Sequence, residues 1–89
     1  MTFIPPQKVR ILRAKVELSR QYQTAWEQAR AEREALTDKA DAIGRDRVTA
    51  DAQKAASAER EATEREFRAW DLYRGHMSSM TRFVGELIE

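Results

Sequence analysis

The chain has 89 residues and a formal net charge of +1, from 16 Lys and Arg against 15 Asp and Glu. This length allows one small domain, and 42% apolar with 35% charged residues is typical of a packed helical domain rather than a disordered tail. The near-neutral charge gives no reason to expect an acidic ligand. The absence of cysteine from the sequence excludes disulfides, thiolate catalysis and zinc knuckles.

The hydropathy pattern argues against a membrane partner. The longest uncharged stretches span about seven residues, far fewer than the roughly 20 that a bilayer crossing needs. Nothing resembles the apolar core of a secretory signal, so we expect a cytoplasmic protein. The abundance of Ala, Arg, Glu and Asp is typical of a GC-rich genome and suggests a bacterial or phage source.

The first predicted element is a long helix over about 7–43. Two prolines stand just before it, where the missing N–H of proline costs nothing. From Val9 to Ile43, apolar and aromatic side chains recur at steps of three and four, which places them on one helix face. Gly44 follows as a natural left-handed cap.

The second predicted element is a helix over about 46–88, reached through a turn at 44–45. Asp46 has a carboxylate that can accept a hydrogen bond from a free N–H of the first turn, so it is the expected cap. The residues from Val48 to Leu87 form a second stripe at the same spacing, and no sustained apolar–polar alternation suggests a strand.

Gly75 leaves two alternatives for the second helix. The helix continues through it at a cost of about 1 kcal/mol, or it breaks over 75–78 and leaves a short C-terminal third helix. Continuation of the helix, with or without a kink at Gly75, is the favoured expectation.

The expected fold is all-α: an antiparallel two-helix coiled-coil hairpin in a single domain over 1–89, self-associating into a helical bundle. With the turn at 44–45, residues whose numbers add to about 90 face each other, which pairs Trp26 with Ala62. Eleven of the fourteen alanines lie between residues 29 and 62, so the aromatic rings are expected at the open end. The alternative is one continuous helix through Gly44 in a parallel dimer.

The residues that carry catalysis are missing or scattered. His76 is the only histidine and falls on the apolar stripe, where packing is its expected role. Tyr73 stands three residues before it, so the Glu-x-x-His pattern of metal-binding bundles is absent. The glycines are too far apart for a phosphate-cradling loop. We therefore expect a protein that is not an enzyme and needs no cofactor and no metal.

Surplus apolar surface is the strongest functional signal in the sequence. A hairpin can hide one stripe per helix, whereas both helices carry a second one near the open end, and a helix that is apolar on two faces needs two partners. We expect a protein–protein interaction module, acting as an adaptor, chaperone-like partner or inhibitor and forming a homodimer. The alternative is that the rings only fill the intramolecular core. The candidate partner-binding residues are Ile11, Leu18, Tyr22, Trp26, Phe67, Trp70, Tyr73, Met77 and Val84.

The first 26 residues are basic, with five positive side chains against one negative. Such a helix can contact phosphates, so a nucleic-acid-associated protein is the alternative function. The basic residues form two sparse rows rather than a dense patch, and no nucleic-acid-binding motif is present, so nucleic acid is not the favoured partner. The other interpretation is a solvated face. The basic-face candidates are Lys8, Arg10, Arg13, Lys15 and Arg20.

Overall fold

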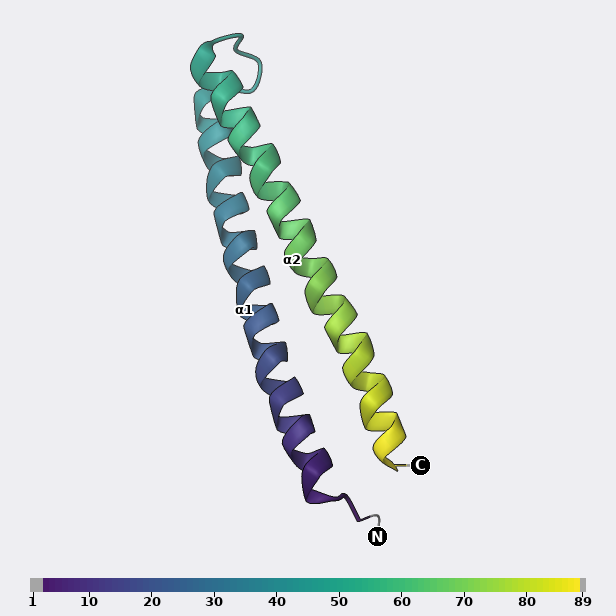
Figure 1. Ribbon diagram of the computed structural model, residues 1–89. Helices are drawn as coiled ribbons and strands as arrows, with labels where there is room; N and C mark the ends of the chain where they lie inside the picture. The colour runs from purple at the N-terminus through teal and green to yellow at the C-terminus, as the bar shows by residue number, and fades with distance from the viewer. Residues whose placement is uncertain (1–2, 89) are drawn as a thin grey trace.

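A computed structural model describes residues 3–88. Over this range the chain forms two helices, α1 (Pro6–Ile43) and α2 (Ala50–Ile88), and no strand. The helices run side by side in opposite directions, and a loop over 44–49 joins them at one end (Figure 1). The molecule is a rod of 65 × 16 × 15 Å. The expected all-helical hairpin is therefore present.

Backbone geometry explains where α1 begins and ends. The carbonyl of Pro5 accepts hydrogen bonds from the backbone N–H groups of Lys8 and Val9, at 3.0 and 3.2 Å. At the other end, the N–H of Gly44 donates to the carbonyl of Ala40 at 3.1 Å. Gly44 has φ +101° and ψ +111°, a positive φ that side-chain-bearing residues rarely adopt. The expected glycine cap therefore forms, although its ψ lies outside the left-handed helical region.

The loop is longer than the sequence suggested, and α2 begins at Ala50 rather than at 46. Thr49 provides the cap: its Oγ1 accepts a hydrogen bond from the N–H of Ala52 at 3.1 Å. Its carbonyl also accepts from the N–H of Gln53 at 3.0 Å. Asp46 was expected to cap α2, but it lies in the loop, four residues before the helix.

The second helix is continuous across Gly75. It runs from Ala50 to Ile88 without interruption, so the described residues contain no break over 75–78 and no third helix. A Cβ added at Gly75 would meet nothing within 4 Å, so this glycine is not required by close packing.

The pairing of the two helices differs from the expected one. Trp26 faces Trp70 and Tyr73, with ring centroids 4.9 and 6.1 Å apart, and not Ala62. The partners on α2 thus lie about two to three helical turns further along than expected. The longer loop accounts for about one of these turns. As a result, the Trp26 cluster lies near the middle of both helices and not at the open end, where α1 begins and α2 ends.

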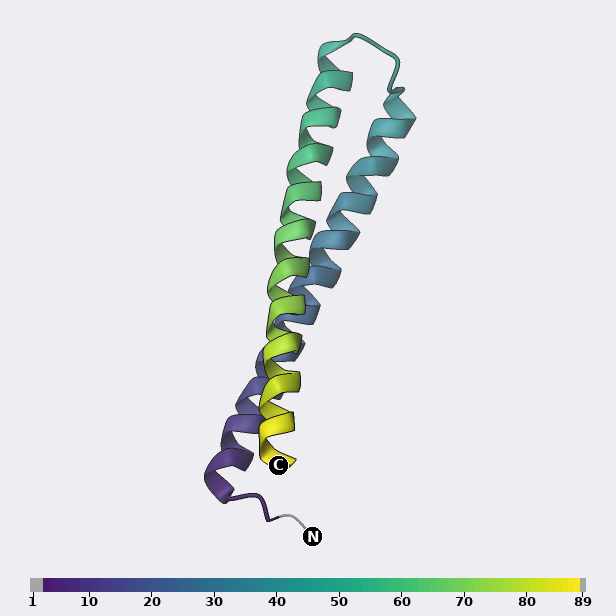
Figure 2. The same cartoon turned by 90° about the vertical axis from the view of Figure 1, so that its right-hand side faces the viewer.

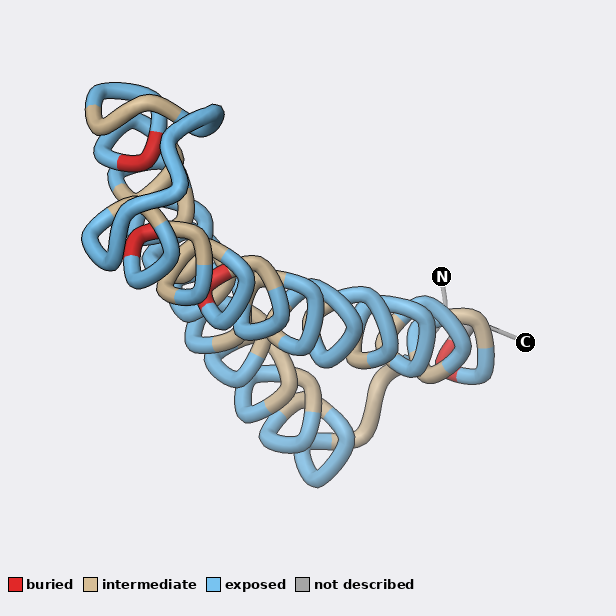
Figure 3. Tube along the Cα trace, turned by 90° about the horizontal axis from the view of Figure 1, so that it is seen from above, coloured by how far each residue is buried: buried red, intermediate tan, exposed pale blue. Residues whose placement is uncertain are grey.

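The hairpin has a thin core. The helices are inclined to one another (Figures 1 and 2), and their contact is a narrow seam. The buried apolar residues are Ala40, Ala55, Ala62 and Leu87, and no large side chain of the described residues is fully buried. Figure 3 shows the same distribution: few residues are buried, and exposed residues occur along the whole rod. Neither helix has an apolar segment suited to spanning a membrane.

Candidate protein-interaction surface

Contacts between the helices recur every seven residues. Ser19 Oγ lies 3.1 Å from Met80 Sδ. Trp26 stacks on Tyr73 with an interplanar angle of 9°. Arg33 Nε donates to Glu66 Oε2 at 2.7 Å. Seven residues separate successive members on each helix, so these pairs define a central seam along which α1 and α2 meet.

Aromatic rings dominate the middle of the seam. Trp26, Trp70 and Tyr73 form a cluster with ring centroids 4.9 to 6.1 Å apart, within the range of favourable aromatic pairs. Tyr22 and His76 form a further pair at 5.3 Å. Tyr22, Trp26 and Tyr73 are half-buried. These three predicted partner-binding residues are therefore engaged inside the hairpin.

A stripe of large apolar side chains follows one side of the seam on α2. Trp70, Met77 and Val84, called here the Trp70 stripe, are 36%, 37% and 38% exposed. Each stands four residues after a seam residue, which turns it about 40° to one side. Phe67 is 63% exposed, and with Trp70 it lines a shallow groove of about 400 Å³. Four of the predicted partner-binding residues thus share one flank.

The opposite flank holds the remaining predicted apolar residues. His76 stands three residues after a seam residue, which turns it to the other side, and its Nε2–H donates to the carbonyl of Lys15 at 2.9 Å. Ile11 and Leu18 stand four residues before Lys15 and Tyr22, so they share this side of α1. Ile11 and Leu18 are exposed, but they do not join the Trp70 stripe.

Sequence reasoning did not single out Leu72, which is 57% exposed. It lies four residues before His76 and so belongs to the same flank as Leu18. We call Ile11, Leu18 and Leu72 the Leu18 flank. The sequence could have indicated this position, because Leu72 stands one residue before the seam residue Tyr73, on the side of α2 that also holds His76.

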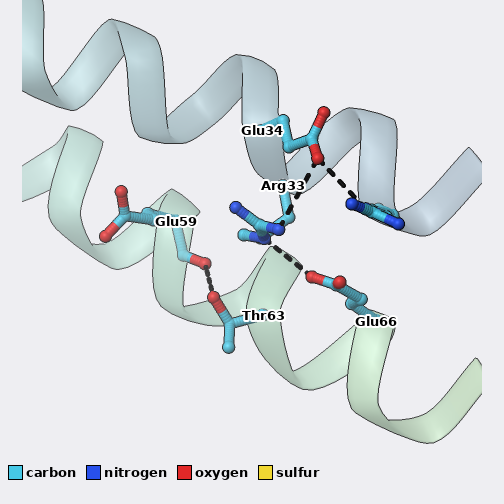
Figure 4. A network of polar contacts seen from close by, with 6 residues as sticks. Arg33, Glu34, Glu59, Thr63 and Glu66 are labelled. Carbon is cyan, nitrogen blue, oxygen red and sulfur yellow. Dashed lines mark hydrogen bonds and ion pairs between the residues drawn. The ribbon is translucent and has the colours of Figure 1, made fainter. Parts of the chain in front are cut away.

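A polar network replaces the apolar seam toward the loop (Figure 4). Arg33 reaches from α1 to Glu66, and both side chains are mostly covered, at 28% and 20% exposed. This hydrogen bond raises the pKa of Arg33. Thr63 donates its hydroxyl to the Glu59 carbonyl at 2.9 Å. Arg33 and Glu66 are charged residues that interrupt the two apolar stripes, and they meet across the hairpin.

Glu59 links the seam to the loop. Arg45 donates to its two carboxylate oxygens at 2.7 and 3.1 Å, and Arg45 also pairs with Asp41. The hydrogen bond from Arg45 lowers the pKa of Glu59, an effect partly offset by burial and reinforced by the Thr37 hydroxyl. This network fastens the loop to the third turn of α2.

The predicted basic residues do not form one face. Arg13 and Arg20 line a hollow on α1 together with Val9 and Val16. Lys15 is half-buried with its Nζ 5.1 Å from the Phe83 ring centroid, on the side of the Leu18 flank. Lys8, at seven residues from Lys15, shares that side, and Lys8 and Arg10 are exposed.

Other features of the described residues offer less to a ligand. No group of three or more His, Cys, Asp or Glu side chains in that part of the chain is placed to hold a metal ion. A hollow of about 680 Å³ lies beside the loop and is lined by small and charged side chains together with Leu36 and Ile43. It contains no aromatic anchor, unlike the groove beside Trp70.

Comparisons with known proteins give no family for this chain. A scan of protein-family models, a search of curated proteins and a search of solved structures each find no match. Its function has to be inferred from its own side chains.

Proposed function

We propose that this chain is a non-enzymatic protein–protein interaction module that binds another protein through the Trp70 stripe. The observation that carries the proposal is the stripe itself: Trp70, Met77 and Val84 stay more than one-third exposed although the seam already packs α2 against α1. A helix with one packed apolar face and a second, uncovered one is suited to helix-against-helix docking.

The chemistry of the stripe fits an interface. Tryptophan is among the residues that contribute most to interface binding energy, above all when surrounded by other apolar groups. Phe67 adds a second exposed ring beside Trp70. The alanine-rich half near the loop offers little comparable area. A cytoplasmic adaptor, chaperone-like partner or inhibitor would use such a surface with no chemistry of its own.

Nucleic-acid binding has less support. Four of the five basic candidates divide between the two flanks of α1, and one of these, Lys15, lies over Phe83. Arg20 also has Glu17 within 3.9 Å. A phosphate-binding face needs its cations gathered on one side.

Capture with a matched pair of variants tests the proposal. Tagged wild type, Met77→Glu and Leu72→Glu would be incubated with lysate of the source cells, and retained proteins, including untagged copies of the chain, would be quantified by mass spectrometry. We expect specific partners to be retained by wild type and Leu72→Glu and lost by at least tenfold with Met77→Glu. Retention that is indifferent to Met77→Glu would contradict the proposal.

The same preparations address nucleic acid. Binding to a DNA duplex through phosphate contacts weakens by about 0.9 log units per contact for each decade of salt. A steep salt dependence of this kind, lost on replacing Arg13 and Arg20 together, would favour the alternative function. We expect no such binding at physiological salt.

A further inference from the structure

We propose that the partner on the Trp70 stripe is a second copy of this chain, packed antiparallel about a two-fold axis level with Trp70. The proposal rests on the proposed function and identifies the protein that occupies the stripe. Two hairpins joined in this way make a four-helix bundle in which the loop of each lies beside the open end of the other.

The exposed area calls for a partner of this size. The chain exposes 7035 Å², whereas a compact monomer of 10.3 kDa exposes about 5,400 Å². The surplus is about 1,600 Å². A homodimer interface removes about 1,000 Å² or more from each subunit. One additional hairpin along one flank therefore covers the surplus, whereas a short peptide would cover only a part of it.

Charges along α1 are arranged to pair with themselves. One line of α1, at seven-residue spacing, reads Arg13, Arg20, Glu27, Glu34 and Asp41. Each member stands one residue after a seam residue. Leu18 stands one residue before a seam residue and belongs to the flank opposite the Trp70 stripe. The charged line therefore lies on the same side as the Trp70 stripe. Turned end for end about Glu27, the line places its two arginines opposite its two outer carboxylates in the second copy.

Side-chain sizes along α2 are arranged in the same way. The line of the Trp70 stripe continues toward the loop through Thr63 and Ala56 at seven-residue spacing. Turned end for end about Trp70, it sets Met77 against Thr63 and Val84 against Ala56 of the second copy. Large side chains then face small ones, as interdigitated packing requires.

Both lines call for the same axis. Trp26 and Trp70 are in contact, with ring centroids 4.9 Å apart, so Glu27 on α1 and Trp70 on α2 lie at one level of the rod. One two-fold axis near this level therefore pairs four of the five charges of α1 and sets large against small side chains on α2, with Glu27 alone facing its own copy. It also brings Phe67, 63% exposed, toward Arg74 of the second copy, where the guanidinium can cover the ring.

The other two-fold arrangement, with both open ends together, would place the charged line of α1 against α2 of the second copy. The pairing of the α1 charges with themselves and the match of large against small side chains on α2 would then both be lost. These two lines therefore favour the antiparallel arrangement.

Sedimentation equilibrium of the full chain tests the proposal, with Leu72→Glu as the matched control. Wild type and Leu72→Glu should have twice the 10.3 kDa chain mass at micromolar concentration, and Met77→Glu should have the mass of one chain. Leu72 is the more exposed of the two residues, so an effect of general stickiness would be larger at Leu72. Circular dichroism checks that each variant keeps its helical content. If Met77→Glu loses its helical signal, Val84→Glu serves as the second variant of the Trp70 stripe.

Two results would overturn the proposal. One is a monomeric wild type, and the other is a dimer that Leu72→Glu dissociates while Met77→Glu and Val84→Glu do not. A monomeric wild type that still retains other proteins in a Met77-dependent manner would leave the proposed function intact and remove only the second copy.

Cysteine cross-linking tests the direction of packing, since the sequence has no cysteine of its own. Residues 13 and 41 lie about 42 Å apart along α1, so they cannot be joined within one chain. Mixed Arg13→Cys and Asp41→Cys chains should form a disulfide-linked heterodimer on oxidation, and Arg13→Cys alone should not. Failure of the mixture to cross-link, or cross-linking of Arg13→Cys with itself, would contradict the antiparallel arrangement.

Discussion

Small residues decide how closely α1 and α2 approach. Ala62 is fully buried, and Ala40 and Ala55 are nearly so, because alanine lets two helices pack without side chains between them. The alanine-rich stretch therefore has a structural role in the half of the rod nearer the loop. The larger rings occupy the middle of the seam, where half-buried positions leave them room.

Replacing Ala62 by leucine tests this close approach. Ala62→Leu adds three carbon atoms to a position with no free surface, and overpacking of this kind costs about 1–3 kcal/mol. The measurement is the free energy of unfolding from urea denaturation. Ala31→Leu, at an exposed position of α1, is the control and should stay within about 0.5 kcal/mol of wild type. Equal effects of the two variants would show that Ala62 is not in the seam.

Glu59 makes the stability of the hairpin sensitive to pH in the acidic range. Its pKa lies below the ordinary 4.5 because Arg45 hydrogen-bonds its carboxylate. A carboxyl group with a lowered pKa stabilises the fold above its ordinary pKa, and this contribution disappears as pH falls through the lowered value. Wild type should therefore lose stability as pH falls below about 4.5.

The Glu59→Gln variant isolates this contribution. It should be less stable than wild type at pH 7, and the difference should shrink as pH falls through the acidic range. The measurement is the thermal midpoint at a series of pH values at low salt. An unchanged difference between the two proteins at all pH values would contradict the assigned role of the carboxylate.

At the scale of the element, the sequence predicted more about the helices than about their junction. Periodicity and the two terminal signals, proline before α1 and Gly44 after it, placed α1 to within one residue. The start of α2 was placed four residues too early, because Asp46 and Thr49 are both good caps and nothing local chooses between them. The structure selects Thr49, whose hydroxyl meets the N–H of Ala52.

A pair of alanine substitutions separates the two caps. Thr49→Ala should reduce the free energy of unfolding by about 1 kcal/mol, the usual cost of losing a cap, whereas Asp46→Ala should have little effect. Chemical denaturation monitored by circular dichroism measures both. The reverse order of effects would place the start of α2 at Asp46.

At the scale of the whole molecule, the sequence left the axial offset of the helices undetermined. Stripes with a seven-residue repeat look the same after a slip of seven residues, so periodicity identifies the inner faces but not which residues meet. Ion pairing does not settle the offset either. Glu59 and Glu66 are seven residues apart on the stripe that faces Arg33, so either carboxylate could be its partner. Packing of the two tryptophans against each other distinguishes the registers, and that contact depends on three-dimensional fit.

The offset also determines how the predicted interaction residues are divided. Nine apolar candidates were expected on one aromatic open end, but three lie in the seam and two lie on the Leu18 flank. The other four, Phe67, Trp70, Met77 and Val84, share the opposite, exposed flank. Identifying them required knowing which side of each helix its neighbour occupies, and the contacts of Lys15 and His76 supply that information.

The most direct test of the account is the distance between two spin labels in one molecule, measured by pulsed electron paramagnetic resonance. Labels at Arg10→Cys and Glu86→Cys, diluted with unlabelled chain, sit at the same level near the open end of the hairpin. Helices 8–10 Å apart place the labels within about 30 Å of each other. A chain that instead formed one continuous helix would separate them by about 110 Å, and loss of the short distance would contradict the hairpin on which the Trp70 stripe depends.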